Sequence, residues 1–246
     1  MKSDVLGVKI DNVDMKNAVS RVLAYTKDKG CRMVFTPNAE MVMAAAKNPS
    51  LMDVLNSSDM TVPDGAGVVL GARLLRMPVK EKVAGIDLIK SVFSTGEKLS
   101  VFLYGSAPGV AEKASENITK TYTNITVCGT EHGYRETNYS TDLVKKINSL
   151  EPDIILVALG VPAQEMWISK NSKNLLAGVA IGCGGTLDVL SGNVKRAPDW
   201  MIKLSLEWLY RLVKQPKRFG RMMQIPLFLL LCLKKRITGS LKAVSF

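Results

Sequence analysis

The stretch Pro63-Asp64-Gly65-Ala66-Gly67 contains the carboxylate best placed to do chemistry in this sequence. It follows the run Asp59–Val62, which we expect to be an extended β-strand. Pro63 restricts the preceding residue to extended conformations, and the glycines allow the chain to turn directly after Asp64. We therefore expect Asp64 at the C-terminal end of a strand, where ligands bind in open parallel sheets.

Two explanations of Asp64 are open at this point. In the first, it is a general base that takes a proton from a substrate hydroxyl. In the second, Asp-Gly is turn chemistry and the carboxylate caps a helix that begins near Ala66. The enrichment of Asp in turns favours the second explanation, and the local sequence does not separate the two.

A glycine-containing loop, Gly105-Ser106-Ala107-Pro108-Gly109, lies between a buried strand and a helix. Glycines let a phosphate approach backbone N–H groups, and the helix N-terminus favours negative charge. A strand-to-helix turn needs glycine in any case. The nucleotide interpretation makes Gly105, Ser106 and Gly109 binding residues.

A second loop places Gln164 and Glu165 in the first turn of a helix. Helix capping explains Glu165, whereas Gln164 is not a cap and could face a cleft.

The third loop, 182–188, contains three glycines directly after the last predicted strand. Such density indicates close approach of the backbone to a ligand or to another element. We assign Gly185 and Asp188 to the predicted nucleotide site.

The elements that must position these residues alternate along the chain. The predicted strands are Val5–Ile10, Met33–Thr36, Asp59–Val62, Ser100–Tyr104, Ile125–Cys128, Ile154–Leu159 and Gly178–Ile181. The predicted helices are Met15–Lys27, Ala39–Lys47, Val68–Leu75, Asp87–Ser94, Val110–Tyr122, Thr141–Leu150 and Ala163–Lys173. This alternation predicts an α/β fold, a Rossmann-like and mostly parallel sheet sandwiched by helices.

The charge is concentrated near the C-terminus. The 246 residues carry a net charge of +11, and residues 195–246 hold 12 Lys and Arg against 2 Asp and Glu, or +10. We therefore predict an α/β catalytic domain over residues 1–194 and a basic, amphipathic helical appendage over residues 195–246. Such an appendage fits an anionic partner. Without aromatic residues interleaved among the basic ones, nucleic acid is not expected.

Several classes of site are disfavoured by composition. The four cysteines form no CxxC pair and His132 is the only histidine, which argues against zinc, against Ser-His or Cys-His catalysis, and for a reducing compartment. No Asp-x-Asp pair follows a predicted strand and no GxGxxG follows the first one, so neither a metal nor a cofactor is expected. The N-terminus lacks a secretory apolar core and no apolar run is long enough to span a bilayer, which predicts a cytoplasmic chain.

The appendage has a helical pattern of its own. On a helix, one polar stripe would be formed by Lys203, Glu207, Arg211, Lys214, Arg218 and Arg221. Beyond it, the apolar run Ile225–Leu233 is followed by Lys234-Lys235-Arg236. This combination favours interfacial binding to an anionic membrane, peripheral on its inner face. The alternative is an ordinary helix pair whose apolar faces dock on the core.

Taken together, the motifs resemble the WecG/TagA/CpsF family of bacterial glycosyltransferases, and most closely its teichoic-acid branch. The resemblance rests on the stretches 35–40 (FTPNAE), 63–68 (PDGAGV), 83–88 (VAGIDL), 105–110 (GSAPGV), 160–165 (GVPAQE), 184–188 (GGTLD), 195–198 (KRAP) and 206–212 (LEWLYRL). They occur in family order and span nearly the whole chain.

The resemblance implies transfer of N-acetylmannosamine (ManNAc) from UDP to undecaprenyl-diphosphate-linked N-acetylglucosamine (GlcNAc). It makes Asp64 the catalytic base, with Thr36, Asn38 and Gln164 lining the same pocket. The arginines that it places over the diphosphate are Arg211, Arg218 and Arg221. Lys82 stands where many relatives have Arg, so a bidentate contact is not expected there.

The implied chemistry fits the residues, because an inverting transfer needs a base for the acceptor hydroxyl and positive charge for the departing diphosphate. One alternative is a related transferase that uses UDP-N-acetylmannosaminuronate or UDP-glucose. Another is a basic membrane-binding module without enzymatic activity, which leaves Asp64 and the glycine loops unexplained. Whether the chain forms a homo-oligomer is open.

Overall fold

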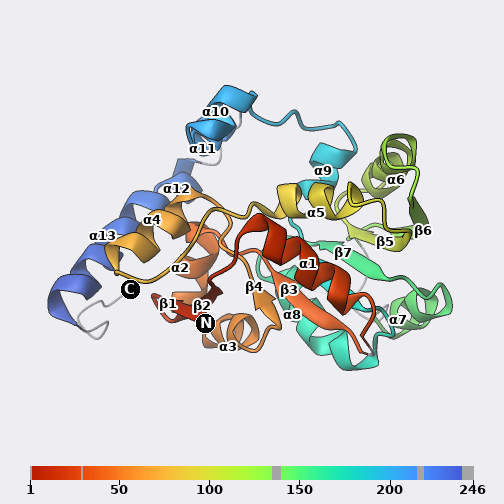
Figure 1. Cartoon of the computed structure of the whole chain (residues 1–246), viewed down its shortest axis with the longest axis horizontal. Coiled ribbons are helices and arrows are strands. Elements are labelled where there is room, and N and C mark those ends of the chain that lie inside the picture. Colours follow the sequence, from red (N-terminus) through yellow and green to blue (C-terminus); the bar gives the residue numbers. More distant parts are fainter. Residues whose placement is uncertain (1, 29, 135–139, 215–218, 240–246) are drawn as a thin grey trace.

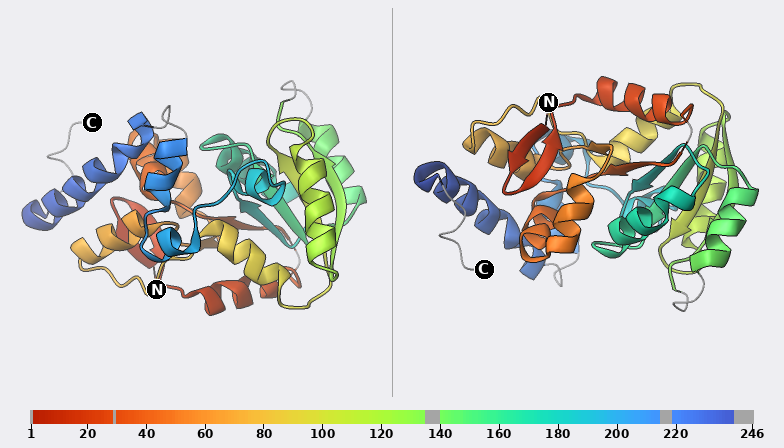
Figure 2. Two further views of the ribbon diagram at one scale, coloured as in Figure 1. Left: turned by 90° about the horizontal axis from the view of Figure 1, so that it is seen from above. Right: turned by 90° about the horizontal axis from the view of Figure 1, so that it is seen from below.

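The computed structural model describes residues 2–28, 30–134, 140–214 and 219–239, excepting the side chains of residues 140, 211, 221 and 222. At its centre is a six-stranded sheet in the order β4-β3-β8-β7-β5-β6, with every pairing parallel. The strands are β3 Arg32–Phe35, β4 Met60–Thr61, β5 Leu99–Gly105, β6 Ile125–Glu131, β7 Ile154–Ala158 and β8 Val179–Gly182. The sheet lies between helices (Figures 1 and 2), which confirms the predicted α/β fold.

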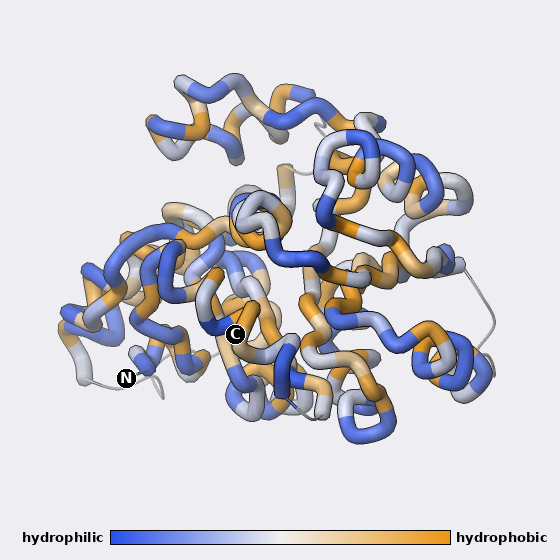
Figure 3. Tube along the Cα trace, turned by 45° about the vertical axis from the view of Figure 1, so that its right-hand side comes forward, coloured by the Kyte–Doolittle hydropathy of each residue, from blue (hydrophilic) through white to orange (hydrophobic). Residues whose placement is uncertain are grey.

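Alternate residues of the strands supply two separate hydrophobic cores. Val101 and Leu103 belong to one core, which is covered by α1 Met15–Tyr25, α5 Gly85–Phe93, α6 Val110–Thr121 and α9 Thr186–Leu190. Phe102 belongs to the other, which is covered by α3 Pro49–Asn56, α7 Ser140–Ser149 and α8 Ala163–Asn171. Both faces of the sheet are therefore buried, as parallel sheets require. In Figure 3 hydrophobic stretches run through the interior of the body, by which we mean the sheet and the helices that cover it.

Two elements near the N-terminus differ from the predictions. The predicted strand Val5–Ile10 instead covers the last residue of one strand, a two-residue turn and most of the next strand in an antiparallel hairpin, β1 Lys2–Val5 and β2 Val8–Asp11. Leu6 and Gly7 both have positive φ, 52° and 97°, as a two-residue hairpin turn demands. The helix α3 was not predicted, because its eight residues place only Leu51 and Leu55 fully in the core.

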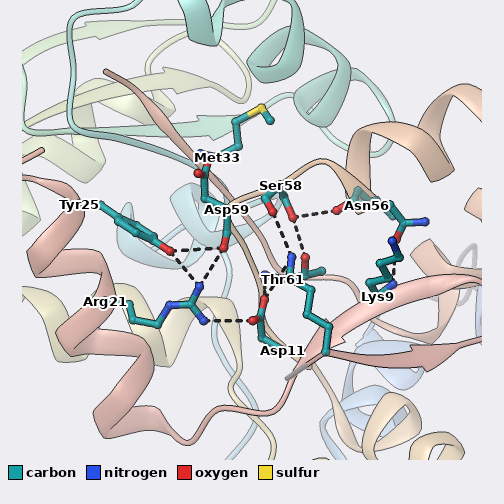
Figure 4. A network of polar contacts seen from close by, with 11 residues as sticks. Lys9, Asp11, Arg21, Tyr25, Met33, Asn56, Ser58, Asp59 and Thr61 are labelled. Atoms are coloured by element: carbon teal, nitrogen blue, oxygen red, sulfur yellow. Dashed lines mark hydrogen bonds and ion pairs between the residues drawn. The ribbon is translucent and has the colours of Figure 1, made fainter. Parts of the chain in front are cut away.

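A partly buried polar network holds β4, the short strand that precedes Asp64 (Figure 4). Asp11 accepts from the backbone N–H of Thr61 at 2.9 Å and from Arg21 at 3.1 Å. The same Arg21 donates to the Asp59 carbonyl at 2.9 Å, and the Asp59 carboxylate accepts from the backbone N–H of Met33 at 2.8 Å. A two-residue edge strand has few ladder bonds, so these side chains fix its position.

The C-terminal segment forms α10 Asp199–Lys203, α11 Glu207–Lys214, α12 Phe219–Met222 and α13 Gln224–Thr238. Its first two helices lie above the body in Figure 1. The predicted polar stripe is not on one helix, because α10 ends at Lys203 and Ser205 has a positive φ of 61° before α11 begins. Arg218 lies outside the described residues.

One face of α13 docks on the body. Phe228, Leu231 and Cys232 are buried against α2 Ala39–Lys47 and α4 Ala66–Leu74, and Phe228 lies where a Cβ on Gly71 would be. Lys235 also forms an ion pair with Asp4 of β1 at 2.7 Å. The opposite face of α13 is exposed and apolar, with Leu227, Leu230 and Ile237. No helix within the described ranges is long and apolar enough to cross a membrane.

Candidate active site

The loops that follow β3 and β4 are joined at the carboxyl end of the sheet. The N–H of Asp64 donates to the Pro37 carbonyl at 3.1 Å, and the N–H of Val83 donates to the Pro63 carbonyl at 2.9 Å. Asp64 therefore lies at the end of its strand, as predicted from Pro63 and Gly65. Gly65 has a φ of +89°, a conformation that favours glycine, and it occupies the N-cap position of α4. The carboxylate of Asp64 is thus not the N-cap residue of this helix.

Thr36 is buried at the end of β3 and connects three segments. Its hydroxyl donates to the Gly182 carbonyl at the end of β8, at 3.2 Å. On its other side, a Cβ on Gly85 would lie only 3.1 Å from the hydroxyl oxygen. Glycine at this position lets the N-terminus of α5 pack directly on Thr36.

Asn38 and Lys82 flank the same region. The Asn38 side chain is exposed and its oxygen caps α2, accepting from the Met41 N–H at 2.9 Å. Its amide N–H groups are the donors that it has to offer a ligand. Lys82 is half-buried and directly precedes Val83, so the structure brings it to the Pro63–Asp64 loop.

Gln164 and Glu165 are the most buried polar residues at this edge of the sheet. They are 2% and 0% exposed, respectively. Gln164 accepts from the Gly184 N–H at 3.0 Å and donates to Glu165 at 2.7 Å. Gln164 thus faces the β8 loop rather than open solvent. Burial raises the pKa of Glu165 to about 7.

The sequence-based explanation of Glu165 as a helix cap is wrong, because Pro162 occupies the N-cap position of α8 and the carboxyl faces the protein interior. Sequence reasoning missed this residue as a site component. The available signal was two adjacent polar residues, Gln164 and Glu165, in the first turn of a helix, where capping needs at most one of them.

The Gly105–Gly109 loop lies over the ends of β5 and β7. Gly105 has a φ of +121° and packs so closely on the Ala158 backbone that a Cβ would collide with it. Ser106 donates its N–H to the Ala158 carbonyl at 2.8 Å. Gly109, with a φ of +82°, is the N-cap of α6 and would have open space around a Cβ. Close packing within the protein thus explains Gly105, while Gly109 borders open space.

Gly185 and Asp188 follow β8, which lies between β3 and β7 in the sheet. Gly185 is exposed after β8, and the Asp188 carboxylate lies 4.0 Å from the position of a Cβ on Gly185. Asp188 belongs to α9, which packs on α6. The predicted nucleotide-binding residues therefore share the carboxyl edge of the sheet.

Arg196 connects α5 to α11 of the C-terminal segment, or tail, and no local feature of the sequence predicts this contact. Its guanidinium lies 2.5 and 2.7 Å from the two oxygens of Asp87 in α5, and 3.6 Å from Glu207 in α11. Arg211 and Arg221 follow in α11 and α12, but their side chains lie outside the description, as does Arg218. Among the residues that are described, no three His, Cys, Asp or Glu side chains are grouped so as to hold a metal ion.

Comparisons with known proteins identify the family of the chain. Residues 3–242 match the sequence profile of the glycosyl transferase WecG/TagA/CpsF family. The chain is 40% identical to an N-acetylglucosaminyldiphosphoundecaprenol N-acetyl-β-D-mannosaminyltransferase of Bacillus subtilis strain 168, over 86% of this chain and 82% of that protein. It is 34% identical to a protein of the same name from Staphylococcus aureus strain MW2, over 93% of this chain and 91% of that protein. The chain belongs to the WecG/TagA/CpsF family of glycosyl transferases.

Proposed function

We propose that this protein transfers ManNAc from UDP-ManNAc to undecaprenyl-diphosphate-linked GlcNAc, forming a β-1,4 linkage in the linkage unit of wall teichoic acid. The relatives at 34–40% identity carry names that specify this hexosyl transfer and this acceptor. The structural observation that carries the proposal is the position of Asp64, where the loops after β3 and β4 are hydrogen-bonded together beside Thr36 and Asn38.

In the proposed reaction Asp64 acts as the general base. Its carboxylate accepts the proton of the acceptor hydroxyl while the hydroxyl oxygen forms a bond to the anomeric carbon of the donor. The bond from that carbon to the diphosphate oxygen breaks, and the electron pair leaves with UDP. Attack opposite the leaving group inverts an α-linked donor to a β-linked product.

The remaining predicted residues are assigned to the donor. Lys82 and the tail arginines Arg211, Arg218 and Arg221 supply positive charge for the departing diphosphate. The Gly105–Gly109 loop and α9 supply backbone N–H groups further along the sheet. Two strand spacings separate β8 from β5, about 10 Å. A nucleoside diphosphate is long enough to reach from one to the other.

Association with an anionic membrane surface through residues 195–246 completes the proposal. It is supported by the exposed apolar face of α13 and by the exposed Lys234 and Arg236 beside it. A helix of this kind lies in the headgroup region with its apolar side toward the acyl chains. The acceptor is itself lipid-linked, so the site would meet it at the membrane.

The test is UDP release by the full chain, with and without a lipid-diphosphate-linked GlcNAc acceptor. We expect release with UDP-ManNAc that depends on the acceptor. Faster turnover with UDP-N-acetylmannosaminuronate or UDP-glucose would keep the family and replace the proposed donor. Release that ignores the acceptor would contradict the proposed transfer.

A further inference from the structure

The hydrogen bonds of Glu165 do not offset the free energy of desolvating its buried carboxyl group. The residue is fully buried, and Oε1 accepts from Gln164 at 2.7 Å, whereas the structure as described gives Oε2 no hydrogen-bond partner. Burying a carboxyl group with an unpartnered oxygen destabilises the folded state. A methionine of similar length would fill the same space without this cost. Stability therefore does not explain a carboxyl group at this position.

The contacts of Gln164 supply another reason. A side-chain amide can be turned by 180° with little change of shape, which exchanges its donor and its acceptor. Oε1 of Glu165 accepts from Gln164 both in the ionised carboxylate and in the neutral acid with its proton on Oε2, so the amide nitrogen faces Glu165. The amide oxygen then faces the Gly184 N–H, which donates to it at 3.0 Å.

The fixed amide in turn holds the loop after β8. Gly184 is held by Gln164 on one side, while the Gly182 carbonyl accepts from the Thr36 hydroxyl at 3.2 Å. Gly182 packs closely on the side chains of Gln164 and Glu165, because a Cβ on Gly182 would lie 3.1 Å from the Gln164 nitrogen and 3.4 Å from Oε1 of Glu165. A rotated Gln164 would therefore release the loop that contacts Thr36.

We propose that Glu165 is a positioning residue for sugar transfer: it fixes the Gln164 amide, and through Gly184 it fixes the loop that bonds Thr36. This inference rests on the proposed function, together with the substrate pocket that the family resemblance assigns to Thr36 and Gln164. Glu165 itself touches no substrate in this account.

The test compares Glu165→Met, which fills the space but accepts no hydrogen bond, with Glu165→Gln, whose amide oxygen still can. For Glu165→Met we expect kcat to fall about tenfold or more, since small displacements of positioning groups are costly, with no loss of melting temperature. Glu165→Gln should recover most of this loss, and KM for the donor should change less than about threefold in either variant. The matched control is Asn171→Leu, a polar-to-apolar change near the other end of α8, which should keep the wild-type kcat.

A second readout needs no activity. Labelling with ¹³C-carbonyl cysteine and ¹⁵N-glycine selects only the amides of Gly129 and Gly184, since these glycines alone follow cysteine. We expect the Gly184 proton to shift upfield in Glu165→Met, because its bond to Gln164 is lost, and to stay in place in Glu165→Gln. Gly129, in β6, is the internal reference and should not move in either variant.

The outcomes separate this inference from the proposed function. If wild type shows no transfer, the proposed function fails, and the Gly184 signal still decides whether Glu165 fixes the loop. An unmoved Gly184 signal in Glu165→Met, or a kcat that Glu165→Met leaves within about twofold of wild type, would overturn the positioning role.

Discussion

The sheet edge and the C-terminal tail hold their functional residues by different means. At the edge, Thr36, Gln164 and Glu165 are buried. Thr36 and Gln164 are hydrogen-bonded to backbone groups of β8 and its loop, and Glu165 accepts from Gln164. In the tail, α10 and α11 connect to the body through Arg196, while α13 is held by a packed apolar face. Buried bonds give the edge one fixed geometry, which suits positioning for chemistry.

The two faces of α13 differ in burial. The inner face belongs to the hydrophobic core that also contains Phe35, whereas the outer face is open. Docking on the body thus accounts for one face of the apolar run 225–233, whereas membrane binding by the exposed face stays a prediction. The division at residue 194 stays a prediction, and residues beyond it contribute to the core.

The largest effect on stability should come from the inner face. Phe228→Ala removes a fully buried ring and leaves a cavity against Gly71, so we expect a loss of about 4 kcal/mol in the free energy of unfolding. Leu230→Ala, on the exposed face of the same helix, should cost less than about 0.5 kcal/mol. Chemical denaturation of both variants measures the difference, and equal losses would show that the two faces are not distinct.

The next effect tests the buried edge through pH. The ordinary pKa of Glu165 is 4.5, and burial raises it to about 7 in the folded state. Between these values the unfolded chain has released a proton that the folded chain retains, so stability falls as pH rises from 4.5 through 7. The full loss is about 3 kcal/mol.

The Glu165→Gln side chain cannot ionise, so this variant should lack the pH-dependent loss of stability that comes from Glu165. The difference in unfolding free energy between the variant and wild type should therefore increase in favour of the variant from pH 5 to pH 8. A constant difference across this range would mean that Glu165 titrates near its ordinary value.

A smaller effect concerns the outer face of the tail. Replacing Lys234 and Arg236 with alanine should weaken binding to anionic vesicles by about 2 kcal/mol at low salt, because each basic residue near the surface contributes about 1 kcal/mol. Lys98, directly before β5, and Lys120, in α6, are exposed, and these two elements lie at the opposite end of the body from α13 in Figure 1. Replacing both lysines should not change binding. Sedimentation with vesicles measures both pairs. If wild type stays in the supernatant at low salt, the membrane proposal fails.

The smallest expected effect is that of removing divalent metal ions on turnover. Because no Asp-x-Asp pair follows a strand, the proposal neutralises the diphosphate with Lys82 and the tail arginines. Turnover should be unchanged in excess EDTA. Loss of activity that Mg²⁺ or Mn²⁺ restores would show that a divalent ion does this instead.

Local signals in the sequence predicted most of the elements that carry the site. The bounds of α2 were predicted at Ala39–Lys47, because Asn38 is a strong N-cap and the apolar spacing is regular. Asp64 was placed correctly, since Pro63 and Gly65 dictate backbone geometry directly. The hairpin turn at Leu6 was missed because leucine rarely adopts positive φ, and apolar residues continue on both sides.

The contacts between distant segments could not be predicted in this way. Arg196 and Asp87 are 109 residues apart, and nothing in either motif indicates the other. The burial of Glu165 likewise depends on the β8 loop folding over it, which no property of the Gln-Glu pair encodes. The sequence thus predicted which residues at the strand ends could do chemistry. The contacts that hold these residues in place could be seen only in the structure.

The most direct test of the account is Asp64→Asn in the full chain, with UDP binding, melting temperature and acceptor-dependent UDP release measured on one preparation. The amide keeps the size of the side chain but cannot accept the proton. We expect UDP binding and melting temperature to match wild type while turnover falls about 100-fold or more. Turnover within about threefold of wild type, where a missing base should cost 100-fold, would contradict the assignment of Asp64 as the base.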